Sequence, residues 1–150
     1  MELNEIIQEI DEKLIVTKKE VKGKLLYIYC QRISEFEKCS YCGHGSTKVH
    51  SKYTREISDL PIAQYKVKLM IEVRKYICDN PECVCKRFAE VLPFAKEHSK
   101  RTERLDEYIH EIGLKNSSVD AANIIRQTHA DISSKTILRV IKKSGDRNKV

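Results

Sequence analysis

Six cysteines are the residues of this sequence best suited to chemistry, and four of them stand in two close pairs. Cys39 and Cys42 are separated by two residues and Cys78 and Cys83 by four, with 35 residues between the pairs. Zinc takes four soft ligands in a tetrahedron, and two thiols this close fit on one tight turn. Gly43 permits the left-handed backbone that such a turn often needs. The spacing predicts a structural zinc ion held by these four thiols.

The remaining thiols and nearby histidines leave alternatives open. Cys85 could replace Cys83 as a ligand, and His44 or His50 could contribute, although histidines in such segments are more often polar loop residues. We expect Cys85 to lie beside the site rather than in it. Cys30 alternates with apolar residues in a β-like segment, which is typical of a buried thiol.

Two other uses of the thiols are less consistent with the sequence. A redox pair formed by Cys39 and Cys42 would leave the second pair without a role. Disulfides would require an oxidising compartment, but residues 1–13 carry acidic residues before any apolar stretch, unlike a secretory signal. No run of about 20 apolar residues exists, so we expect no membrane span. These features favour a cytoplasmic protein.

Charge is unevenly distributed along the 150 residues, whose formal net charge is +6. Residues 1–47 carry 7 Lys/Arg and 8 Asp/Glu, whereas residues 98–150 carry 11 and 7. A basic region favours polyanions, of which nucleic acid is the commonest. Four thiolates around Zn²⁺ would lower the net charge by two. Such a closed site leaves no open position for water and therefore performs no hydrolysis.

Apolar periodicity divides the chain into a β-rich first part and a helical second part. Helical spacing over residues 3–14 predicts a short amphipathic helix, and alternation over 25–30 and 65–77 predicts strands. Asp59-Leu60-Pro61 is expected to mark the bend before the longest strand. We predict an α+β fold, with an N-terminal β-rich, zinc-ribbon-like domain (1–97) and a small three-helix, helix-turn-helix-like domain (98–150).

Three helices are expected after residue 98. Gly113 is a plausible stop signal for the first, Ser117-Ser118 offers an N-cap for the second, and Ser133 offers one for the third. The polar face of the third helix carries candidate DNA-binding residues, namely Ser134, Lys135, Thr136, Arg139, Lys142 and Lys143. Polar and basic residues at a helix start suit phosphate and major-groove contacts. An ordinary solvated face is the alternative, and the spacing before the third helix is longer than a tight bihelical turn allows.

Several motifs follow one another in an order that matches a known family. They are Cys39-Ser-Tyr-Cys42-Gly43, Val49-His50-Ser51-Lys-Tyr53-Thr-Arg55, Asp59-Leu60-Pro61-Ile62, Arg74-Lys-Tyr76-Ile-Cys78-Asp-Asn-Pro-Glu-Cys83, Arg87-Phe88-Ala89-Glu90, Arg101-Thr102-Glu-Arg104-Leu105 and Ser117-Ser118-Val119. Over residues 25–143 the chain resembles the N-terminal region of transposases of the ISL-three family of bacterial insertion sequences.

This resemblance implies a zinc-binding domain and a helix-turn-helix that recognise the terminal inverted repeats of a mobile element. It places Cys39, Cys42, Cys78 and Cys83 at ligand positions and Cys85 outside them. Catalysis in the family belongs to a later domain with an acidic triad, which we expect to be absent, so we predict no enzyme activity. The expected partner is double-stranded DNA at transposon ends, with a homo-oligomer or a full-length transposase as further partners, and the resemblance implies a bacterial, nucleoid-associated location. The alternatives are a zinc-stapled protein-interaction scaffold and a free-standing DNA-binding regulator.

Overall fold

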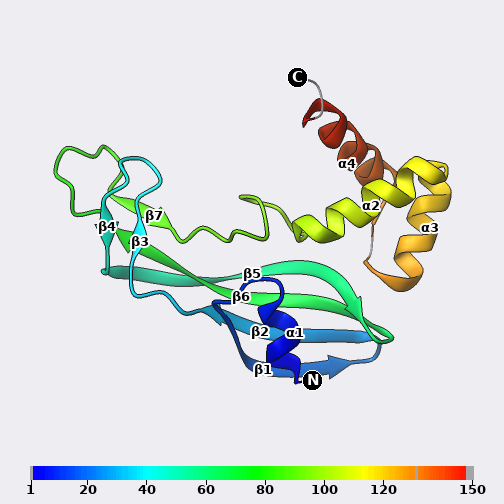
Figure 1. Ribbon diagram of the computed structural model, residues 1–150, viewed down its shortest axis with the longest axis horizontal. Coiled ribbons are helices and arrows are strands. Elements are labelled where there is room, and N and C mark those ends of the chain that lie inside the picture. The colour runs from blue at the N-terminus through cyan, green and yellow to red at the C-terminus, as the bar shows by residue number, and fades with distance from the viewer. Residues whose placement is uncertain (1, 131, 148–150) are drawn as a thin grey trace. The chain divides into compact units, whose positions relative to one another are not determined.

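A computed structural model describes residues 2–130 and 132–147, with Thr128 and residues 143–147 described by their backbone only (Figure 1). The chain forms two compact units that interleave along the sequence. The first unit contains Met1–Lys19, Ile28–Glu56 and Leu69–Pro93, and the second contains Glu20–Tyr27, Ile57–Lys68 and Phe94–Val150. The predicted division into domains 1–97 and 98–150 stays a prediction.

A β-sheet supplies most of the regular structure before residue 90. Its strands are β1 (Leu14–Lys22), β2 (Leu25–Arg32), β5 (Val49–Ile62), β6 (Tyr65–Ile77) and β7 (Arg87–Ala89). The order along the sheet is β1-β2-β6-β5, and β7 also pairs with β6. The alternation predicted for β6 is confirmed, because Leu69, Ile71 and Val73 are fully buried while the residues between them are half-buried. The sheet therefore buries one face by the period-2 pattern of its sequence.

The bend expected at Asp59-Leu60-Pro61 is wrong, because all three residues lie inside β5. The chain instead reverses after Ile62, where Ala63 adopts a left-handed backbone with φ of 53°. The first helix, α1 (Leu3–Gln8), is also shorter than the predicted span of 3–14. The chain turns between α1 and β1, where the Ile10 amide donates to the Ile7 carbonyl and the Leu14 amide donates to the Asp11 carbonyl, both at 3.0 Å. Strand pairing outweighed local turn chemistry in β5, whereas a local turn ended α1.

Three helices form the C-terminal part of the second unit: α2 (Glu103–Lys115), α3 (Ser118–Thr128) and α4 (Ser134–Arg147). The predicted caps are confirmed: the Ser117 hydroxyl accepts a hydrogen bond from the Asp120 amide at 3.2 Å, and the Ser133 hydroxyl accepts one from the Thr136 amide at 3.3 Å. The helices share a buried cluster that includes Leu105, Ile109, Ala121, Ala122, Ile125, Ile137 and Val140. None of the described helices is both long and apolar enough to cross a membrane.

Gly113 does not end the first of these helices, contrary to expectation, because α2 continues through Lys115. A side chain at this position would crowd α4. A Cβ at Gly113 would lie 2.6 Å from Cδ1 of Ile141 and 3.1 Å from Cγ2 of Ile137. These side chains of α4 would have to shift to make room for it.

Candidate metal centre and helical face

The first pair of thiols is carried by a short hairpin. Strands β3 (Glu37–Lys38) and β4 (Gly45–Ser46) pair in antiparallel register. Between them, the Cys39 amide donates to the His44 carbonyl at 2.9 Å, and the Gly43 amide donates to the Cys39 carbonyl at 2.8 Å. Gly43 has φ of 76°, a conformation that side chains other than glycine rarely adopt. The hairpin holds Cys39 and Cys42 on one turn, as predicted.

The second pair lies on the loop between β6 and β7. The Cys78 amide donates to the Lys86 carbonyl at 2.9 Å and so closes the base of the loop. Inside it, the Asn80 side chain accepts from the Glu82 amide at 3.1 Å, and the Asn80 carbonyl accepts from the Cys83 amide at 3.1 Å. These bonds form an Asx turn that lets four intervening residues fit where two are commoner.

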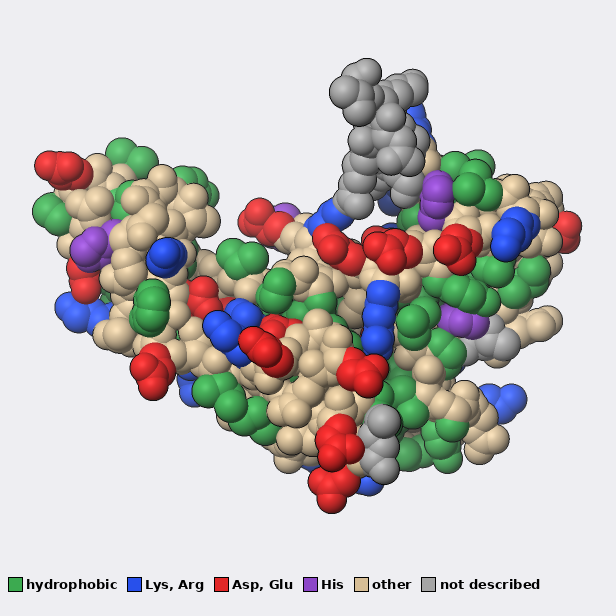
Figure 2. All heavy atoms as spheres, in the orientation of Figure 1, with side chains coloured by type: hydrophobic (Ala, Val, Ile, Leu, Met, Phe, Trp, Pro, Cys, Tyr) green, Lys and Arg blue, Asp and Glu red, His purple; other side chains and the backbone are tan. Residues whose placement is uncertain are grey.

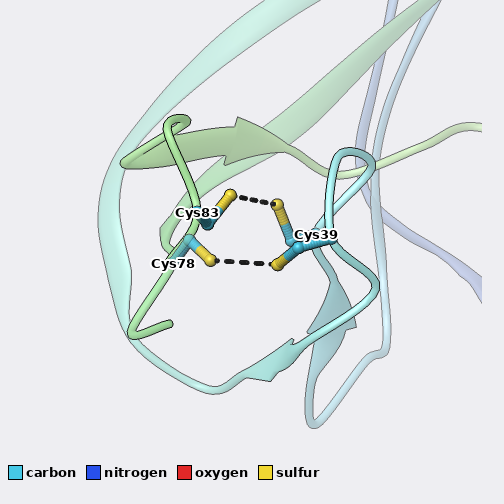
Figure 3. Close-up of side chains that lie close together, drawn as sticks. Cys39, Cys78 and Cys83 are labelled. Carbon is cyan, nitrogen blue, oxygen red and sulfur yellow. Dashed lines mark hydrogen bonds between the residues drawn. The ribbon is translucent and has the colours of Figure 1, made fainter. Parts of the chain in front are cut away.

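The two turns bring the four thiols together from opposite sides (Figure 3). The Sγ atoms of Cys39 and Cys83 are 3.9 Å apart, and those of Cys42 and Cys78 are 3.6 Å apart. All four ligand atoms lie within 4.8 Å of one another. A tetrahedron of sulfurs about 2.3 Å from a zinc ion has edges of about 3.8 Å. The spacing of the thiols therefore fits a structural zinc ion.

The other candidate ligands lie outside this cluster. Cys85 is half-buried and its thiol donates to the Arg87 carbonyl at 2.7 Å, which satisfies it without a metal. His44 and His50 are exposed and contribute no atom to the cluster. Cys30 is 2% exposed in β2, and burial raises the pKa of its thiol to about 12. The interpretation of Cys30 as a buried thiol is confirmed.

The thiols of the cluster differ in how readily they ionise. The backbone amide of His44, followed by the side chain of Asn80, lowers the pKa of the Cys42 thiol to about 6. For Cys78 the Asn80 amide acts in the same direction, but burial and the neighbouring thiols outweigh it and raise the pKa to about 12. Burial also raises the pKa of Cys83. A bound divalent cation would favour the ionised form of all four thiols, because it pairs with every thiolate at once.

Buried side chains next to the thiols tie the two turns together, and the sequence analysis gave none of them a role at the site. Ser46, 3% exposed, donates its hydroxyl to the Ile77 carbonyl at 2.5 Å, which joins the first turn to the strand that leads into the second. The rings of Tyr76 and Phe88 stack with centroids 5.6 Å apart. Both rings belong to one buried cluster with Cys39 and Cys78. This packing holds the two turns that carry the thiols next to each other.

A buried ion network supports the same turns. Arg32 is 8% exposed and contacts Asp11 at 2.5 Å, Glu37 at 3.6 Å and Glu90 at 4.0 Å. Arg74 contacts Glu90 at 3.5 Å. Burial raises the pKa of Glu90, and both arginines oppose that shift. Because Glu37 lies in β3 and Glu90 follows β7, the two arginines fix the roots of both turns. In the sequence, this role could have been inferred from the position of Arg32, which follows Leu26, Ile28 and Cys30 on the buried face of β2.

The helical part of the second unit is anchored by a buried carboxylate. Asp59 in β5 is fully buried and accepts hydrogen bonds from the Thr102 hydroxyl at 2.7 Å and from Nε of Arg104 at 2.8 Å. A second contact joins it to Nη2 of Arg104. The Thr102 hydroxyl also accepts from the Leu105 amide and so caps α2. Two motifs of the resemblance, distant in sequence, therefore meet here.

The candidate DNA-binding residues of α4 do not share one environment. Lys135, Arg139 and Lys142 are exposed, whereas Ser134 and Thr136 are half-buried. The Thr136 hydroxyl lies 3.0 Å from that of Ser133, at the helix cap. The side chain of Lys143 lies outside the described residues. Acidic side chains gather along α2 instead, where Glu103, Glu107 and Glu111 are exposed (Figure 2).

Four thiols on two turns with β-strands behind them define a zinc ribbon. Residues 35–85 match the family described as zinc-finger of transposase IS204/IS1001/IS1096/IS1165. The chain is 30% identical over 99 residues to the transposase for insertion sequence element IS1001 of Bordetella parapertussis, a match that covers 66% of this chain and 23% of that protein. No solved structure matches the chain. The predicted resemblance to the N-terminal zinc region of these transposases is confirmed.

Proposed function

We propose that this chain is the DNA-binding portion of an insertion-sequence transposase, acting in the bacterial cytoplasm on the terminal inverted repeats of its element. Cys39, Cys42, Cys78 and Cys83 bind a structural zinc ion, and α4 supplies the contacts to the duplex. The zinc-ribbon match supports the transposase assignment. The observation that carries DNA binding is the exposed cationic face of α4.

That face suits a duplex for electrostatic and geometric reasons. Lys135, Arg139 and Lys142 stand at positions i, i+4 and i+7, on one side of the helix. Within the described part of the chain, none of the three has an acidic partner, so their charges are available to phosphates. The opposite side of α4 is buried through Ile137 and Val140. We therefore assign α4 the role of the recognition helix, with Ser134, Thr136 and Lys143 as further contacts.

The zinc ion is given a structural role in this proposal. Four thiolates complete a tetrahedral shell, so no position remains for a water molecule or a scissile phosphate. Closing a site between turns 35 residues apart contributes folding free energy to a small β-core. We propose that the described residues bind DNA and that they carry out no strand cleavage.

A gel-shift titration of the zinc-loaded chain tests this function. Duplexes from the ends of the element that encodes the chain are compared with scrambled duplexes of the same composition. The triple variant Lys135→Gln, Arg139→Gln, Lys142→Gln should bind more weakly, and the slope of log K against log salt should fall by about 0.9 for each lost phosphate contact. A matched control, Lys18→Gln, Lys19→Gln, Lys22→Gln on exposed β1, removes the same charge elsewhere. Equal binding to ends and scrambled duplexes would contradict the proposal.

A protein-interaction scaffold is the second candidate, because several large apolar side chains of the helices are exposed. Leu114 is 65%, Val119 58% and Ile124 38% exposed. Tyr108 does not contribute to such a surface, since it is half-buried and its ring stacks on His129 at 4.2 Å. This candidate predicts salt-insensitive capture of a protein, such as a second copy or a full-length transposase. Light scattering of the purified chain with and without duplex distinguishes the two.

A further inference from the structure

One large apolar side chain interrupts the cationic face of α4. Leu138 is 55% exposed and lies three residues after Lys135 and four before Lys142, so it shares their side of the helix. It belongs to the second turn of α4, and the N-terminal residues of a recognition helix are the ones that reach base edges. Leucine forms no contact with phosphate, so its position calls for an apolar partner.

The two borders of this face have different surroundings. On one border, Thr136 and Arg139 line a groove of about 580 Å³ that also holds acidic and basic side chains, namely Glu97, Glu103, Asp106, Glu107, Lys96, Lys100 and Arg101. These charges offset one another, as in the ion pair of Arg101 and Asp106 at 2.6 Å. Leu138 does not line the groove and lies toward the other border, beside Lys142. Its polar neighbours on α4 are therefore the exposed cations Lys135 and Lys142.

The major groove offers one apolar group, the C5-methyl of thymine, and an apolar side chain distinguishes thymine through it. We propose that Leu138 is a specificity-determining residue that packs against the C5-methyl group of a thymine in the recognised duplex. The proposal rests on the proposed function, since it needs α4 to enter the major groove. The neighbouring lysines then hold the phosphates on either side of that base.

Replacing thymine by uracil removes only this methyl group, which makes the contact measurable. The duplex bound most tightly by the zinc-loaded wild-type chain, selected from a randomised pool, is resynthesised with uracil at each thymine in turn. We expect one substitution to weaken wild-type binding about fourfold, the equivalent of one buried methyl group. Leu138→Ala should bind the unmodified duplex no more tightly than the wild-type chain binds the uracil-substituted one. Uracil at that position should not weaken binding of this variant further.

Two controls make the result specific to Leu138. Leu114→Ala removes another exposed leucine, near the end of α2, and should keep the wild-type uracil profile. Circular dichroism should show unchanged helix content in both variants, because neither side chain is buried. The proposal is overturned if Leu138→Ala retains both wild-type affinity and the wild-type uracil profile. It is also overturned if the variant converts a dimer into monomers in light scattering. Failure of the wild-type chain to prefer any duplex would instead refute the proposed function, and this inference with it.

Discussion

The carboxylate of Asp59 holds the start of α2, so Asp59→Ala tests how strongly the helices depend on β5. The substitution removes the acceptor for the Thr102 hydroxyl at 2.7 Å and for Nε of Arg104 at 2.8 Å. It leaves the bond from the Leu105 amide to Thr102 in place. The expected result is a less stable second unit, while the four thiols of the first unit still bind zinc.

The size of the stability loss depends on how well water can hydrate the Thr102 hydroxyl and the Arg104 guanidinium once Asp59 no longer accepts from them. Thr102 is fully buried, and a buried donor left without a partner costs about 1–3 kcal/mol. The side chain of Arg104 is 35% exposed, so solvent takes up part of its charge and the loss of its pair contributes about 1 kcal/mol at most. We therefore expect Asp59→Ala to lower the free energy of unfolding by about 1–4 kcal/mol.

Urea unfolding followed by far-UV circular dichroism measures this loss at fixed zinc. Thr102→Ser keeps both hydrogen bonds of the hydroxyl and serves as the matched control, with an expected loss below about 1 kcal/mol. In a Thr102→Ala background the orphaned hydroxyl no longer exists, so Asp59→Ala should cost about 1–2 kcal/mol less than in the wild type. A loss below about 1 kcal/mol in the wild type, or strict additivity with Thr102→Ala, would refute this reasoning.

Three further outcomes are expected. Cys78→Ser should abolish stoichiometric zinc in metal analysis whereas Cys85→Ser should retain it, and equal zinc in both variants would exclude the proposed ligand set. Gly113→Ala should destabilise the chain by up to about 2 kcal/mol, because the new Cβ meets Cδ1 of Ile141 at 2.6 Å. Adding Ile141→Val removes that atom and should recover part of the loss, since Cγ2 of Ile137 remains 3.1 Å from the new Cβ, so an additive double variant in urea unfolding would count against the close approach. Burial lowers the pKa of His129, so the unfolded chain takes up its proton first, and stability should fall as the pH drops below 6.5. The urea midpoint of His129→Phe should fall less between pH 7.5 and pH 5.5 than that of the wild type, and parallel profiles would contradict this.

Local patterns predicted the elements whose signals are carried by neighbouring residues. The thiol pairs indicated two turns, and Gly43 takes the left-handed backbone that was expected of it. Ser117 and Ser133 were identified as caps because a hydroxyl satisfies amides only three residues away. The alternation in β6 predicted its buried face, since side chains in a strand alternate by geometry.

The features that were predicted wrongly or missed share a physical cause, which is contact with residues distant in sequence. Gly113 was interpreted as a helix stop because helix propensity takes no account of neighbouring helices. In the structure this glycine leaves room for the side chains of Ile137 and Ile141 in α4. Asp59 was assigned to a bend because acidic residues before proline favour turns. Its carboxylate instead accepts hydrogen bonds from Thr102 and Arg104. Arg32 gave only a weak signal, because a buried arginine is tolerated only where distant carboxylates neutralise it.

The sequence by itself determined which atoms could bind a metal and which helix carries cations, because both depend on residue types at short spacing. Tertiary structure decided that Cys39 meets Cys83 and Cys42 meets Cys78, and that Ser46 and Arg32 hold those turns in place. It also decided that Leu138 lies exposed among lysines while Ile137 beside it is buried. These relations join residues far apart along the chain, and only the packing of strands and helices sets the distances between them.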